Sequence, residues 1–292
     1  MRRQLAKRAE WALGAFLVTA GCSDGNNDRF DGGIGNPVGR PTLEESIQFG
    51  LGVDDVPQAT LTNGTAEVSV SRAFDVRVRV DGGPDATWRD SDLVALSTPI
   101  LDGVEVYATD RSSDFFFRSA IGTSNANLDY AAFGFWAQTG TAGVLDMRLP
   151  VRVDDAGPLD FGVRTASRDM PFSGGASYDG EAIGGEFQGR DLVSILRGSF
   201  AADADFGRGL IEGRISLDDQ DGLGWGNIDT GVMDIDGSRF GGGSESAVAT
   251  RGQTGRVEGA FYGPDANEVA GTFRLRGGLD GTTVLGAFGG RD

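Results

Sequence analysis

The sequence contains no histidine, one cysteine and one lysine, which are Cys22 and Lys7. Without histidine the chain has no Ser-His-Asp triad, no histidine metal ligand and no histidine to hold a haem. Without a lysine beyond position 7 it has neither a Schiff-base lysine nor the lysine of a phosphate-binding P-loop. We therefore predict that the protein is not an enzyme, that it uses no cofactor and that it has no metal site.

Positive charge is also scarce, because 26 Lys and Arg stand against 43 Asp and Glu and give a formal net charge of -17. Proteins that bind nucleic acids neutralise phosphates with basic patches, so we predict no nucleic-acid partner. The acidic run 218–222 begins like a calcium-binding loop, but the twelfth position counted from Asp219 is Thr230 instead of glutamate. An acidic hairpin turn is the expectation there.

The N-terminal region has the pattern of a targeting signal. A start that contains Arg2, Arg3, Lys7 and Arg8 precedes an apolar run over residues 11–20. This run is too short to span a bilayer, which takes about 20 apolar residues, but it fits a secretory signal.

The apolar run ends in Thr19-Ala20-Gly21-Cys22, which resembles the signal of bacterial lipoproteins. The resemblance implies that residues 1–21 are a signal peptide and that Cys22 carries the lipid. It also implies an outer-membrane protein held by a lipid anchor, which we expect on the cell surface. Residues 22–42 are rich in Gly, Asn and Asp and are expected to form a flexible linker. Ordinary signal cleavage beside an incidental cysteine is the alternative.

The rest of the chain has the period of β-strands. Apolar and polar residues alternate over 74–80, 147–153, 211–217 and 269–275, which predicts strands with one apolar face and one wet face. Asp-Gly and Gly-Pro turn signals recur between such segments. The main helix signal is a capping box that starts at Thr42, with Glu45 three residues later.

These patterns predict an all-β protein. A β-rich handle domain over residues 43–165 is followed by an eight-stranded antiparallel β-barrel over residues 170–292. A transmembrane barrel is the rival interpretation, and it needs an unbroken apolar outer band. Charged residues at outward positions argue against it: Glu212, Arg214, Arg256, Glu258 and Arg274.

The stretch 255–273 reads GRVEGAFYGPDANEVAGTF, and it strongly resembles the C-terminal barrel of the transferrin-binding protein B family. That family carries G-x-F-Y-G-P-x-A-x-E-x-G-G-x-F, and here Ala270 replaces the first glycine of the pair. The segments 170–180 and 288–291 are similar to the start and the end of the same barrel. The residues of this structural motif are Gly259, Phe261, Tyr262, Gly263, Pro264, Glu268, Gly271 and Phe273.

The chemistry of the motif predicts an architectural role. Gly263 and Pro264 set a tight turn, and Glu268 is expected to accept backbone N–H bonds within the hairpin loop. Gly259 and Gly271 are expected to let neighbouring strands approach closely.

The resemblance implies a surface lipoprotein that binds an iron carrier, haemoglobin or a complement regulator without catalysis. It also implies a TonB-dependent receptor as a partner in iron acquisition, and an outer-membrane translocator that exports the protein. The full transferrin binder has two lobes, whereas this chain has room for one handle and one barrel. Two alternatives remain open: a binder of a small solute or haem with a pocket in the handle or barrel, and a structural envelope lipoprotein.

The handle contains three consecutive phenylalanines, Phe115, Phe116 and Phe117. Successive side chains of a strand point to opposite faces, so at least one of the three points away from its own core. We predict that this triplet contacts a partner, and packing against the barrel is the alternative.

Overall fold

The computed structural model describes residues 41–51, 53–55, 58–83, 85–94, 104–109, 115–119, 128–139, 149–278 and 280–292. The predicted signal peptide (1–21), the lipidated Cys22 and most of the predicted linker lie outside these residues. No helix in the described ranges is long and apolar enough to cross a membrane.

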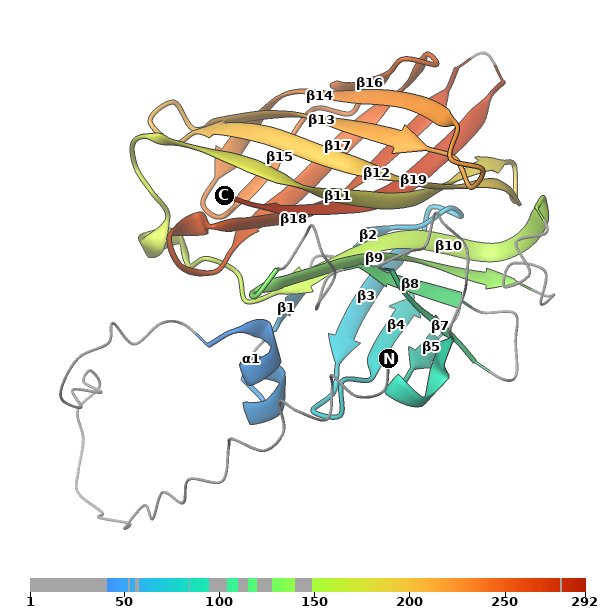
Figure 1. Ribbon diagram of the computed structural model, residues 1–292, viewed down its shortest axis with the longest axis horizontal. Helices are drawn as coiled ribbons and strands as arrows, with labels where there is room; N and C mark the ends of the chain where they lie inside the picture. Colours follow the sequence, from blue (N-terminus) through green and yellow to red (C-terminus); the bar gives the residue numbers. More distant parts are fainter. Residues whose placement is uncertain are drawn as a thin grey trace, which may run out of the picture. The chain divides into compact units, whose positions relative to one another are not determined.

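An antiparallel barrel of eight strand positions forms the C-terminal part of the chain and confirms the predicted fold class. It closes because β11 pairs with both β12 and β19, and the short strands β15 and β16 share one position between β14 and β17 (Figure 1). Its strands are β11 (Gly175–Gln188), β12 (Asp191–Asp205), β13 (Leu210–Asp218), β14 (Gly224–Asp236), β15 (Arg239–Gly241), β16 (Ala247–Ala249), β17 (Gln253–Tyr262), β18 (Glu268–Gly277) and β19 (Thr282–Arg291).

The handle contains one antiparallel sheet that lies against the barrel, which we call the handle sheet. Its strands, in spatial order, are β10 (Val151–Gly162), β9 (Ala131–Thr139), β8 (Phe115–Ser119), β7 (Glu105–Ala108) and β6 (Leu93–Val94), with β1 (Asp54–Asp55) paired to the end of β10. Strand β10 also pairs briefly with β12 of the barrel. The handle sheet is therefore joined to the barrel wall by backbone hydrogen bonds.

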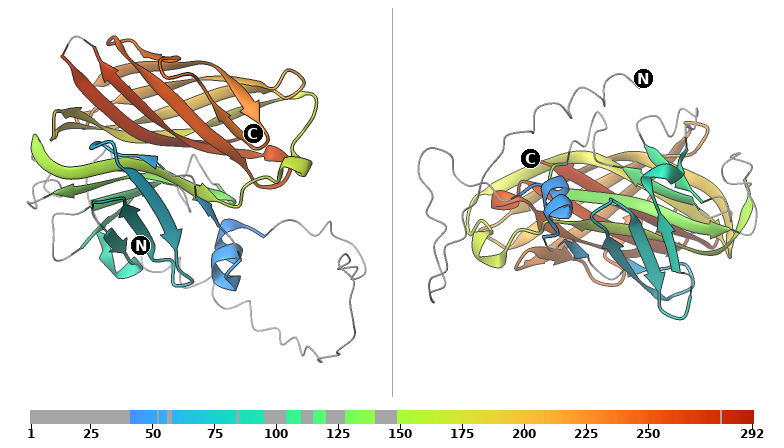
Figure 2. Two further views of the ribbon diagram at one scale, coloured as in Figure 1. Left: turned by 180° about the vertical axis from the view of Figure 1, so that it is seen from behind. Right: turned by 90° about the horizontal axis from the view of Figure 1, so that it is seen from below.

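A second, four-stranded sheet covers the other face of the handle sheet (Figures 1 and 2). Its strands are β2 (Gln58–Ala59), β3 (Thr65–Val70), β4 (Val76–Val80) and β5 (Asp85–Trp88). The alternation predicted for β4 is confirmed, because its three valines are buried and its two arginines are exposed. Helix α1 (Leu43–Phe49) begins with the predicted capping box, in which Thr42 and Glu45 exchange hydrogen bonds of 2.9 and 3.2 Å.

The apolar residues form two separate cores. One fills the inside of the barrel and is rich in aromatic rings, with Phe200 and Phe288 stacked at 4.3 Å between ring centroids. The other lies outside the barrel and joins its wall to the handle sheet and the four-stranded sheet, with Phe135 of β9 against Phe187 of β11. Strand β9 of the handle sheet is therefore buried on both faces: all nine of its residues except Gln138 are fully buried.

The prediction of one wet face is confirmed for β13 and wrong for β18. Glu212 and Arg214 on β13 are exposed, as the alternation required. On β18, the outward Ala270 and Thr272 are buried as well as the inward residues. The reason is that the handle covers the outer face of this strand, which a local sequence pattern does not reveal.

Candidate functional site

The sequence motif of residues 255–273 lies at the junction of barrel and handle and includes the turn that joins β17 to β18. We call residues 262–268 the motif turn; it contains the short helix η6 (Pro264–Ala266). Gly263 has φ 74°, and Asp265 and Ala266 also take left-handed values, 56° and 59°. Non-glycine residues rarely adopt this conformation, so the surrounding contacts must hold the turn in place.

Glu268 connects the motif turn to the start of β9. Its Oε1 accepts the N–H of Asp129 at 2.6 Å, and its Oε2 accepts those of Tyr130 and Ala131 at 2.9 and 3.0 Å. The carboxylate thus binds backbone groups 137 to 139 residues away in the sequence. The expectation that Glu268 bonds within its own hairpin loop is wrong, because its carboxylate accepts three N–H groups at the start of a handle strand instead. Burial raises the pKa of Glu268, and these three hydrogen bonds oppose the rise.

Gly263 connects the same turn to the end of β10. Its N–H donates to the carbonyl of Val163 at 2.9 Å, and its carbonyl accepts the hydroxyl of Thr165 at 2.7 Å. A Cβ at this position would collide with the ring of Tyr130. The motif turn therefore binds the beginning of β9 and the segment after β10 at once, and only glycine fits its first corner.

A buried polar network lies beside the turn. The hydroxyl of Tyr262 donates to Asp160 Oδ2 at 2.7 Å, and Gln58 Nε2 donates to Asp160 Oδ1 at 2.5 Å. Thr272 Oγ1 donates in turn to Gln58 Oε1 at 3.1 Å. The four residues come from β17, β10, β2 and β18, so the network ties both handle sheets to the barrel wall.

The network shifts the titration of its members. Burial raises the pKa of Asp160 to about 6, although the hydrogen bonds from Tyr262 and Gln58 favour the charged form. Burial and the neighbouring Asp160 raise the pKa of Tyr262 well above its ordinary value. Asp160 is 2% exposed and its hydrogen-bonding capacity is used by its neighbours, which suits a structural group better than a catalytic one.

The remaining motif residues face the barrel interior. Phe261 and Phe273 are buried there, and the ring of Phe261 contacts those of Phe240 and Tyr178 at 5.3 and 6.0 Å between centroids. Gly271 lies so close to β17 that a Cβ would collide with the carbonyl of Glu258. A filled interior therefore lies directly behind the motif.

The phenylalanine triplet forms the start of β8, and its first two members are buried. Phe115 is 0% exposed and its ring lies 6.2 Å from that of Phe135, on the barrel side of the handle sheet. Phe116 is 1% exposed and stacks on Trp88 of the four-stranded sheet at 5.3 Å. Both pack inside the protein, so the predicted partner contact is wrong for Phe115 and Phe116. The side chain of Phe117 lies outside the described part, so a partner contact of Phe117 stays a prediction.

The acidic run 218–222 forms a hairpin turn. Asp219 Oδ1 accepts the N–H groups of Asp221 and Leu223 at 2.9 and 3.0 Å, bonds that are typical of an aspartate within a tight turn. In the described ranges, no group of three or more Cys, Asp or Glu side chains is placed to hold a metal ion.

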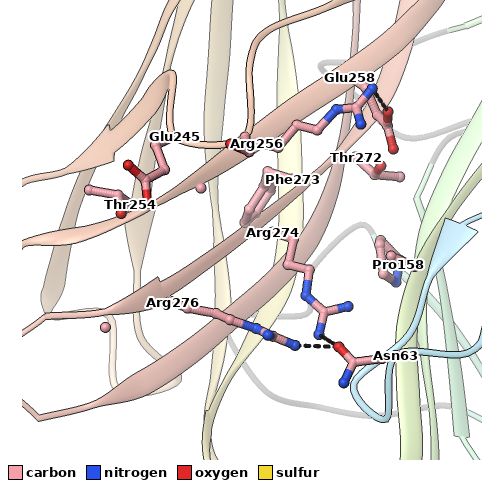
Figure 3. A pocket seen from close by; sticks show the side chains of 14 residues that line it. Asn63, Pro158, Glu245, Thr254, Arg256, Glu258, Thr272, Phe273, Arg274 and Arg276 are labelled. Atoms are coloured by element: carbon pink, nitrogen blue, oxygen red, sulfur yellow. Dashed lines mark hydrogen bonds and ion pairs between the residues drawn. The ribbon is translucent and has the colours of Figure 1, made fainter.

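Sequence reasoning missed two features of the junction. The first is the network around Asp160, whose partners are about 100 residues away or on another sheet. The second is a pocket of about 520 Å³ on the outer face of β17 and β18, bordered by Asn63 and Pro158 of the handle (Figure 3). The sequence signal for the pocket is the set of outward arginines on two neighbouring strands, a pattern that is also typical of a solvated surface.

Comparison with known proteins agrees with the motif. The family model described as the C-lobe and N-lobe beta barrels of Tf-binding protein B matches residues 170–292. No curated protein matches the chain.

Several solved structures are similar to the chain at TM-scores below 0.5. Intact Ap-TbpB with its N and C lobes has 19% identity and a TM-score of 0.43, with 78% of this chain and 52% of that chain covered. Isotype 1 transferrin-binding protein B from serogroup B Neisseria meningitidis has 16% identity and a TM-score of 0.42, with coverages of 78% and 52%. A surface lipoprotein has 16% identity and a TM-score of 0.38, with coverages of 81% and 99%.

The chain spans about half the length of the first two of these structures. The family model, by contrast, matches the barrel sequence itself. Residues 170–292, the C-terminal domain of this chain, match the barrel model of the transferrin-binding protein B-like lobe family.

Proposed function

We propose that the protein is a surface-exposed outer-membrane lipoprotein that captures a protein ligand, such as an iron carrier, without catalysis. The observation that carries this proposal is the family match of the barrel over residues 170–292. The anchor is the lipid on Cys22, and residues 22–42 are the tether between the anchor and the folded part. A TonB-dependent receptor and a surface-export translocator are the further partners that the resemblance implies.

The packing of the barrel supports a protein ligand over a small solute held inside the barrel. Its interior is occupied by buried side chains, which include Tyr178, Phe200 and Phe288. Large apolar side chains are exposed on the outer surface of both parts instead: Phe49, Leu51 and Leu93 in the handle, and Phe172, Leu223, Val232 and Val248 within residues 170–292. Exposed apolar side chains commonly anchor protein partners.

The anchor and the location are tested on intact cells. The wild-type protein should incorporate a labelled fatty acid and should be digested when protease is added to whole cells. The variant Cys22→Ala should incorporate no label and leave the membrane fraction. A periplasmic marker that stays intact shows that the cells were sealed. Survival of the wild-type protein on sealed cells would contradict the surface location.

The ligand class is tested on the same cells. Cells that display the protein should retain fluorescent transferrin or haemoglobin, the two probes, above the level of cells without the gene. Pre-treatment with protease should abolish the difference. If the protein is on the surface and neither probe is retained, capture of these iron carriers is excluded and the structural alternative gains support.

A further inference from the structure

The pocket on the outer face of β17 and β18 has an unusual arrangement of charge. Register places Arg256 of β17 directly opposite Arg274 of β18, and Arg276 lies two positions further along the same face. Like charges in directly opposed positions destabilise a sheet. The outward Arg214 of β13, by contrast, lies opposite Asp229 of β14. The pocket thus concentrates positive charge in a chain whose formal net charge is -17.

The charges in the pocket are only partly compensated. Arg256 forms an ion pair of 2.7 Å with Glu258. Within the described residues, no carboxylate pairs with Arg274 or Arg276. Both guanidinium groups converge on the side-chain oxygen of Asn63, at 2.7 and 2.5 Å (Figure 3). Arg274 makes one further bond, from Nη1 to the carbonyl of Thr60 at 2.5 Å.

The two guanidinium groups have spare donors that face a common space. Each guanidinium carries five N–H donors, and a single amide oxygen accepts only about two hydrogen bonds. The planar donor fork of arginine matches carboxylate and phosphate oxygens, and such charge-assisted bonds are stronger than neutral ones. A volume of about 520 Å³ is in the range of small-molecule sites, and Ala59 and Pro158 give it an apolar wall.

We propose that this pocket binds a small organic oxyanion, whose carboxylate or phosphate group sits between Arg256, Arg274 and Arg276. The anion supplies the negative charge that the opposed arginines lack. Glu245 also lines this pocket, and its negative charge repels an anion. The acidic group of the ligand is therefore directed toward the end of the pocket where Arg274 and Arg276 converge. The site is independent of the protein capture proposed above, because it lies between handle and barrel and needs no anchor.

The alternative role for these arginines is to fasten the turn at Asn63 to the barrel. That role needs Arg274, which bonds to both Asn63 and the backbone of Thr60. Among the described residues, Arg256 forms no hydrogen bond or ion pair with the handle, and Arg276 only shares the oxygen of Asn63. These two positions therefore separate ligand binding from fastening.

The experiment is calorimetric titration of the full chain, purified in detergent, with succinate and with inorganic phosphate as the two probes. Saturable binding of at least one probe is expected, and the tighter probe identifies the oxyanion class. Arg276→Gln and Arg256→Gln should each weaken that binding about tenfold or more. The control Arg214→Gln, an exposed outward arginine of the same barrel, should leave the affinity unchanged.

Thermal unfolding of each variant checks that the fold persists, since both substituted arginines are exposed. The absence of saturable binding for both probes overturns the proposal. Binding that is equally strong in Arg276→Gln and Arg256→Gln also overturns it, because the anion would then sit elsewhere.

Discussion

The barrel has two kinds of outer wall, and the contrast between them explains how the handle is held. On β12 and β13 the outward residues, such as Ala201, Glu212 and Arg214, are exposed. On β18 and β19 the outward Ala270 and Ala287 are fully buried beneath the handle sheet. The interior face is apolar in both regions, so the difference lies entirely outside the barrel.

The covered wall is built for close approach. Several of its outward positions are small, such as Ala270 and Ala287, and a Cβ at Gly289 would collide with the ring of Phe133 on β9. The open wall carries charged residues that keep it in contact with water. Size alone does not mark a covered position, because the outward Ala201 is exposed whereas the outward Ala270 is buried, and the layer outside the strand decides which it is.

The largest effect is expected when a charge is placed on each wall in turn. Ala270→Glu buries an unpaired carboxylate under the handle and should lower the free energy of unfolding by more than about 4 kcal/mol. Ala201→Glu places the same side chain on the open wall, opposite Arg214, and should change it by less than about 0.5 kcal/mol. Urea unfolding followed by tryptophan fluorescence measures both. Equal effects would mean that the handle does not cover β18.

The next largest effect is expected at Glu268, which fastens the covered wall to β9. Glu268→Ala leaves three N–H groups of the handle without an acceptor and should cost about 3–5 kcal/mol. Glu268→Gln keeps one acceptor oxygen and should cost about half as much. Glu212→Ala on the open wall is the matched control, with an expected change near zero. A loss in Glu212→Ala as large as in Glu268→Ala would contradict this role.

Local patterns predicted the parts of this architecture that depend on local chemistry. The capping box of α1, the alternation in β4 and β13, and the closed barrel with its family motif all follow from neighbouring residues. The motif also identified Glu268 as an acceptor of backbone N–H groups, which is what it does.

The same patterns did not predict the contacts that cross between domains. The partner of Glu268 lies 137 to 139 residues away, and the coverage of β18 depends on a sheet from the other half of the chain. Phe116 shows the same limit, since its strand face is covered by Trp88 of a separate sheet. The alternation of apolar and polar residues along a strand predicts that one face is buried, but it does not predict what packs against the other face.

A smaller effect, dependent on pH, is expected from Asp160 in the covered junction. Its pKa is about 6 in the folded protein, against about 4 when unfolded, so folding takes up a proton between these values. Its contribution to stability is complete below pH 4 and is lost as the pH rises through 6, in total about 3 kcal/mol.

Asp160→Asn remains neutral at every pH and should remove this part of the dependence. Chemical unfolding at pH 5 and pH 7.5 measures the difference, which should shrink by about 1.4 kcal/mol in the variant, because at pH 5 about half of the total contribution is already lost. A residual slope of the same sign is expected from Glu268, whose pKa burial also raises. An unchanged slope in Asp160→Asn would show that Asp160 is already ionised at the lower pH.

The smallest effect is expected at Asp85, an exposed carboxylate with a lowered pKa, whereas Asp160 is buried and has a raised pKa. It pairs with Arg77 on the exposed face of the four-stranded sheet, and the hydrogen bond from Arg77 lowers its pKa. The sign is therefore reversed: any stabilisation is present at neutral pH and is lost as the pH falls through the lowered pKa. Water screens this exposed pair, so Asp85→Asn should leave Tm at pH 7.5 within experimental error, at both low and high salt. Asp160→Asn and Asp85→Asn remove the same charge. A large change of Tm in Asp85→Asn would therefore contradict the idea that burial decides how much an aspartate contributes to stability.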